Sequence, residues 1–119
     1  SKETKHSTLK GLEANGIRAL SVKKDLKSGH LDLVNTFKNI ANIGMNNLFV
    51  EPGVMLFGSL MNYSLPDDIM IFKSHEGLGE SGLKVQQIDQ LLNNENSDYQ
   101  KNYEKIIFDT TMFHYKKIR

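Results

Sequence analysis

The stretch that decides the fold runs from Ile40 to Lys73 and reads IANIGMNNLFVEPGVMLFGSLMNYSLPDDIMIFK. It holds four of the five methionines of the chain and three of its six phenylalanines. Asparagine, glycine and proline interrupt it repeatedly, so it predicts several short elements instead of one long helix or a membrane span. Methionine and phenylalanine on such a broken backbone suit either an adaptable core or a contact surface for another chain.

Two turns are expected to divide this stretch. Glu51-Pro52-Gly53 predicts the first, because proline disfavours helix at the residue before it and Pro-Gly suits a turn. Leu65-Pro66-Asp67-Asp68 predicts the second. Between them, residues Val54 to Met61 are expected to form a short buried segment, either helix or strand. Residues Ile69 to Phe72, after the second turn, have the composition of a short strand.

Outside this stretch, apolar spacing predicts further helices. Apolar residues at three- and four-residue steps predict one over Leu31–Leu48 and a shorter one over Leu83–Leu92. Ser97 to Gln100 match a capping box, so a last helix is expected to begin there. Ile106–Tyr115 is rich in β-branched and aromatic residues and is open to a strand instead. Ile17–Val22 suits a short strand or the first turns of a helix.

These elements predict an α+β, helix-rich fold with three to four helices, one or two short strands and a small single core. Residues 1–8 are polar and are expected to form an arm, and residues 9–119 a single domain. A chain of 119 residues, 39% hydrophobic and 24% charged, is long enough for one core and too short for a two-domain enzyme.

The small formal charge of +1 disfavours a dedicated nucleic-acid binder, which concentrates basic residues on one face. Only two of the fifteen basic residues are arginines. A small regulatory module that binds nucleic acid nevertheless stays as the alternative function. Its candidate residues are the basic groups toward the two ends of the chain: Lys23, Lys24, Lys27, Lys116, Lys117 and Arg119.

The absence of cysteine excludes a disulfide framework and a thiolate metal site, which fits a reducing compartment. The first ten residues contain no apolar stretch of the kind that a signal peptide needs, and no apolar run has transmembrane length. We therefore expect a cytoplasmic protein, or one in a particle that is assembled in the cytoplasm.

No catalytic, cofactor or metal site is expected, and the chain is predicted not to be an enzyme. Gly77 to Gly82 match G-x-G-x-x-G, which leaves a phosphate- or nucleotide-binding loop as a third possibility. Four residues separate this loop from the expected strand, however, so a plain glycine loop is favoured. The four histidines are scattered and share no ligand spacing; they are His6, His30, His75 and His114.

The leading hypothesis is a non-enzymatic structural or interaction subunit of a multi-chain assembly, formed with copies of itself or with other proteins. A small component of a virus particle or phage tail is one such role. The proposed mechanism is burial of the methionine-rich segment between chains. The candidate interface residues are Met45, Phe49, Met55, Phe57, Met61, Met70 and Phe72.

Overall fold

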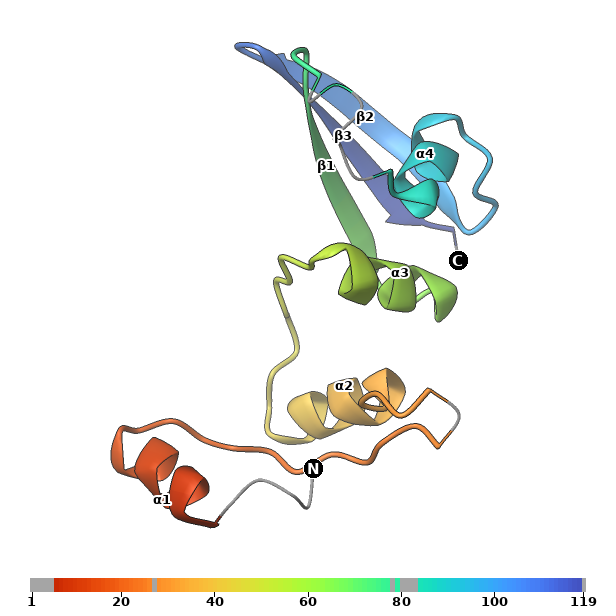
Figure 1. Cartoon of the computed structure of the whole chain (residues 1–119). Helices are drawn as coiled ribbons and strands as arrows, with labels where there is room; N and C mark the ends of the chain where they lie inside the picture. Colours follow the sequence, from red (N-terminus) through yellow and green to blue (C-terminus); the bar gives the residue numbers. More distant parts are fainter. Residues whose placement is uncertain (1–5, 27, 78, 80–83, 119) are drawn as a thin grey trace. The chain divides into compact units, whose positions relative to one another are not determined.

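The computed structural model of the chain describes residues 6–26, 28–77, 79 and 84–118. Two compact units are distinguished, Ser1–Val50 and Glu51–Arg119, and each is described by itself. Figure 1 follows the chain from the first unit (red to yellow) into the second (green to blue). The expectation of one domain over residues 9–119 stays a prediction.

The first unit begins with helix α1, His6–Ala14, which starts inside the segment expected to be a polar arm. Gly16 lies two residues beyond the end of the helix, and its φ of +74° is the left-handed conformation that glycine adopts most easily. The Gly16 amide donates to the carbonyl of Glu13 at 3.0 Å. Ile17–Val22, expected to be a strand or the start of a helix, is neither.

Helix α2, Leu33–Asn42, is shorter at both ends than the predicted helix over Leu31–Leu48. The Asp32 carboxylate accepts a hydrogen bond from the Asn35 amide at 2.9 Å and caps its first turn. The chain leaves the helix at Gly44, where φ is +91°. None of the described side chains between residues 8 and 50 is buried.

The second unit holds two more helices and a sheet. The helices are α3, Val54–Asn62, and α4, Gln86–Leu92. The strands are β1, Asp68–Ser74, β2, Tyr99–Ile107, and β3, Thr110–Lys117. The strand order is β1-β3-β2, with both pairings antiparallel, so the last strand in the sequence lies in the middle of the sheet (Figure 1).

The predicted α+β class is confirmed, with four helices among the described residues, but the expectation of one or two strands is wrong because three are described. The capping-box prediction is also wrong, since the chain from Tyr99 to Ile107 is strand β2 and not a helix. A two-residue turn, Phe108-Asp109, folds β2 back onto β3. The pairing of β2 with β3 stabilises the strand conformation more than a four-residue capping pattern can stabilise a helix.

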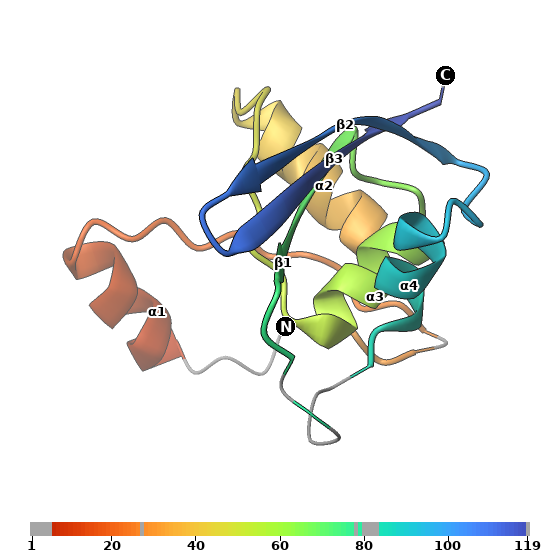
Figure 2. The same cartoon turned by 90° about the horizontal axis from the view of Figure 1, so that it is seen from above.

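The core lies on one face of the sheet, where α3 and α4 cover it. Alternate residues of β1, Ile69 and Ile71, are buried on this face, as the two-residue period of a strand requires. They pack with Met61, Leu91, Tyr99 and Tyr115, flanked by Phe57, Ile88 and Phe113. Gly58 of α3 leaves room for the Gln87 side chain of α4, because a Cβ atom there would lie 3.3 Å from the Gln87 amide. Figure 2 shows α3 and α4 side by side.

Candidate functional site

The second face of the sheet carries large apolar side chains that neither α3 nor α4 covers. Phe72 is 62% exposed and Met70 53%, although the residues that precede them on strand β1, Ile71 and Ile69, are buried. The two-residue period of the three strands places further apolar residues on the same face. We call this set the open-face patch: Met70, Phe72, Tyr103, Ile107 and Met112.

A buried histidine lies at the centre of this open face. His114 comes from the central strand and is only 6% exposed. Its Nε2 atom lies 2.8 Å from Oδ1 of Asp68 on β1, and its Nδ1 atom lies 3.1 Å from Nδ2 of Asn102 on β2. The Tyr103 ring covers it, with the two ring centres 4.9 Å apart. Three strands therefore contribute to one polar cluster within the apolar face.

The two contacts of the His114 ring fit one neutral tautomer. An amide nitrogen can only donate, so Asn102 makes Nδ1 of His114 an acceptor. The ring proton is then on Nε2, which donates to the Asp68 carboxylate. Asn102 reaches His114 because a β-bulge between Lys101 and Tyr103 leaves it without a partner on β3. Both ring nitrogens are satisfied, so the cluster is a structural polar centre.

The tip of the hairpin exposes a strained aromatic residue. Phe108 is 97% exposed and has a φ of +55°, a conformation that bulky side chains rarely adopt. Its neighbour on the strand, Ile107, belongs to the open-face patch. Phe108 gains nothing from the core to offset the backbone strain. Such outliers are frequent at functional positions.

The structure distributes the predicted interface residues over three environments. Met70 and Phe72 lie in the open-face patch, and Met55 is 75% exposed on α3. Met61 is a buried core residue and Phe57 packs against the core, so neither belongs to an exposed surface. In the first unit, Met45 and Phe49 follow α2 and are both exposed.

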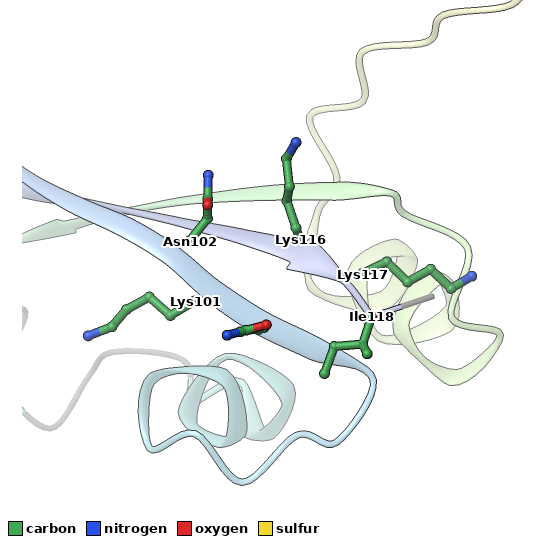
Figure 3. Close-up of a pocket in the computed structure, with 6 residues that line it drawn as sticks. Lys101, Asn102, Lys116, Lys117 and Ile118 are labelled. Carbon is green, nitrogen blue, oxygen red and sulfur yellow. The ribbon is translucent and has the colours of Figure 1, made fainter.

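The basic residues near the end of β3 surround a hollow of about 260 Å³. It is lined by Gln100, Lys101, Asn102, Lys116, Lys117 and Ile118. Figure 3 shows the ammonium groups of the three lysines pointing away from one another. A phosphate site needs several donors aimed at one point, and these side chains do not provide it.

Each of these lysines also has an interaction within the chain. Lys101 pairs with Glu104 at 2.9 Å, and this hydrogen bond raises the pKa of the lysine. Lys116 lies 4.0 Å from the Asp68 carboxylate, and Lys117 donates to the carbonyl of Ser64. Of the other candidates for nucleic acid, Lys23 and Lys24 lie in the first unit. Lys27 and Arg119 lie outside the described residues.

The remaining sequence candidates add no site. In the glycine loop only Gly77 and Gly79 are described, and the predicted phosphate contacts fall largely outside the described residues. Within the described part of the chain, no group of three or more His, Asp or Glu side chains is placed to hold a metal ion. No described helix is long and apolar enough to span a membrane.

Two tyrosines on the covered face differ in their hydrogen bonding. The Tyr99 hydroxyl donates to the carbonyl of Pro66 at 3.0 Å. Burial raises the pKa of Tyr99 to about 12, with Asp98 and Asp67 adding to the effect. The Tyr115 hydroxyl is buried without a hydrogen-bond partner among the described residues, and burial raises its pKa too. Both tyrosines belong to the hydrophobic core on the covered face of the sheet.

Sequence reasoning missed both the polar cluster and the strained aromatic. Asp68 and His114 are 46 positions apart, so no local spacing connects them. Phe108 could have been found only from the alternation that flanks the Phe108-Asp109 turn, had that segment been assigned to a hairpin.

A scan against protein-family models finds no matching family, and a search of curated proteins finds no relative.

Proposed function

We propose that the chain is a structural or interaction subunit that works by packing against other protein chains. The observation that carries this proposal is the open-face patch on one face of a sheet, in which Met70, Phe72, Tyr103 and Ile107 are exposed and Met112 is half-buried. Single exposed apolar residues are ordinary, but clusters on a regular surface are typical of protein contacts. Methionine and aromatic residues are also the types enriched at such contacts.

The polar cluster supports selectivity of the contact. Asp68 is about half exposed and sits at the rim of the patch, whereas its partner His114 is buried beneath it. A docking chain therefore meets apolar side chains, with the Asp68 carboxylate and the Lys116 ammonium group at one edge and Lys105 beside Met112. A partner that covers this carboxylate without offering a donor loses the hydration of a charged group, which is costly. The carboxylate thus favours partners with a matching donor.

Helix α2 adds a second, independent argument. Its apolar residues follow a helical stripe, yet none of them is buried among the described residues of the first unit. A short isolated helix is only marginally stable unless its apolar face is covered. Assembly with another chain supplies such cover, which is what an interaction subunit requires.

The methionines provide a direct test, because peroxide oxidises exposed methionine more readily than buried methionine. In the dilute full chain, Met70 is expected to react quickly and Met61 slowly. On association, at high concentration or in extract of the source cells, Met70 and Met112 become protected, while Met61 serves as the internal control. If Met70 reacts equally fast under all these conditions, the proposal is wrong.

A further inference from the structure

We propose that strand β1 pairs antiparallel with β1 of a second copy of this chain, joining two three-stranded sheets into one continuous sheet. The inference rests on the proposed function. It identifies the partner as a second copy of this chain and the contact as strand β1. It does not depend on the covered face or on the first unit. The argument comes from the two edges of the sheet, from the backbone of β1 and from its charges.

The two edge strands differ in their protection. Strand β2 has a bulge between Lys101 and Tyr103 and carries charges along its length. Bulges and lysines are the usual features that keep an edge from pairing with another chain. Strand β1 keeps an unbroken register with β3 over all seven residues. Its middle, Ile69 to Phe72, has no charge, proline or bulge.

The backbone of β1 offers regular bonding groups on its outer side. Lys117 donates to the carbonyl of Asp67 at 2.9 Å, and His75 donates to the carbonyl of Asp109 at 3.0 Å. In an antiparallel ladder, residues whose backbone groups bond to the neighbouring strand alternate with residues whose groups point away from it. These two bonds therefore show which residues of β1 bond to β3. The odd-numbered residues bond to β3, so Met70 and Phe72 direct their N–H and C=O groups outward. No other described strand pairs with them (Figure 1).

The charges at the two ends of β1 complement each other in this arrangement. Asp67 precedes the strand and Lys73 lies near its end, and both side chains are exposed. A two-fold axis perpendicular to the sheet keeps each residue on its own face. With Met70 opposite Met70 of the second copy, each Asp67 faces a Lys73 across the new pairing, and each Asp68, which is already bonded to His114, faces a Phe72. The two open-face patches then become neighbours on one broad surface.

The main test compares two proline variants by sedimentation of the full chain. Phe72→Pro removes an outward N–H group from β1, which an edge strand tolerates in the monomer. Ile106→Pro is the control for proline on the other edge strand, and Phe72→Ala is the control for loss of the Phe72 ring from the open-face patch. Ile106 is 69% exposed, and its partner Thr111 directs its backbone toward β1, so the Ile106 N–H also points outward. Circular dichroism establishes that both proline variants are folded.

We expect the unmodified chain to dimerise. Phe72→Pro should raise the dimer dissociation constant about tenfold or more, and Ile106→Pro should change it less than about threefold. A charge swap provides a second test that leaves the backbone unchanged. Lys73→Glu places like charges together and weakens the dimer, and adding Asp67→Lys restores it. Equal effects of the two prolines, together with no effect of the charge changes, would overturn the pairing.

Other outcomes separate this inference from the proposed function. A dimer that survives Phe72→Pro and is lost in Met112→Lys would place the contact on the open face, so the edge pairing would be wrong and the proposed function would stand. A chain that stays monomeric at millimolar concentration would also overturn the pairing. The methionine footprint in cell extract then decides the proposed function separately.

Discussion

Asp68 and His114 come from neighbouring strands, and the exposed carboxylate of one accepts a hydrogen bond from the buried imidazole of the other at 2.8 Å. The arrangement gives the open face a polar centre that is fully bonded from within. A buried imidazole that loses a partner keeps its desolvation cost, so the acid stabilises the histidine more than an ordinary surface pair would.

Asp68→Ala should therefore lower the free energy of unfolding by about 1–2 kcal/mol, because His114 Nε2–H is left without its acceptor. Asp67→Ala is the control, since that carboxylate makes no hydrogen bond in the described part of the chain. It should change stability by less than about 0.5 kcal/mol. Urea unfolding of the dilute monomer measures both. Equal losses in the two variants would contradict the assigned role of Asp68.

Tyr99 and Tyr115 form a second matched pair, since both rings are buried and only Tyr99 has a bonded hydroxyl. Tyr99→Phe should cost about 0.5–1.5 kcal/mol of unfolding free energy through the lost bond to Pro66. Tyr115→Phe removes a buried hydroxyl that has no partner in the described structure. It should be neutral or stabilising by up to about 1 kcal/mol. A larger loss of unfolding free energy in Tyr115→Phe than in Tyr99→Phe would contradict this prediction.

Alkaline pH should destabilise the second unit through Tyr99. The pKa of this residue is about 12 in the folded chain, against the ordinary value of 10.0. A raised folded pKa means that the stabilisation is fully present below pH 10 and is lost as the pH rises toward 12. Denaturant unfolding across this range should show a steep fall, which Tyr99→Phe makes shallower. An identical pH dependence in the variant would show that another group is responsible.

We expect Phe108 to lower the stability of the folded chain through its backbone strain and to strengthen association through its exposed ring. Phe108→Gly relieves the positive φ, whereas Phe108→Ala removes the ring and keeps most of the strain. The glycine variant should be more stable than the alanine variant by about 1 kcal/mol in thermal unfolding. If the exposed ring contributes to assembly, both variants should associate more weakly to the same extent. A glycine variant no more stable than alanine would exclude backbone strain at this turn.

The sequence predicts those elements whose signals are local. Apolar spacing located both α2 and α4, with errors only in their lengths: the predicted helix over Leu31–Leu48 ran through Gly44, whereas α2 ends at Asn42. The helix breaks expected near the two prolines are present, since irregular backbone at residues 51–53 precedes α3 and residues 63–67 separate α3 from β1, but the turn lies at Tyr63-Ser64 and not in either predicted segment. Each of these signals depends on side chains a few residues apart, which sequence patterns describe well.

Strand β2 could not be predicted in the same way. Tyr99 is its only buried residue, so the strand lacks the apolar alternation that identifies half-buried strands. Its conformation is set by pairing with β3, and the capping pattern at Ser97 pointed instead to a helix. The polar centre could not be predicted either, because His114 contacts Asp68 and Asn102 only when the three strands have come together.

The order of the strands also constrains how the second unit acquires its structure as the polypeptide is made. The middle strand is the last of the three to be synthesised, so neither β1 nor β2 can begin a ladder until residues 110–117 have left the ribosome. Until then the methionines and phenylalanines of residues 54–74 remain unprotected in the nascent chain. That interval is when this segment is most vulnerable to premature aggregation and to capture by chaperones.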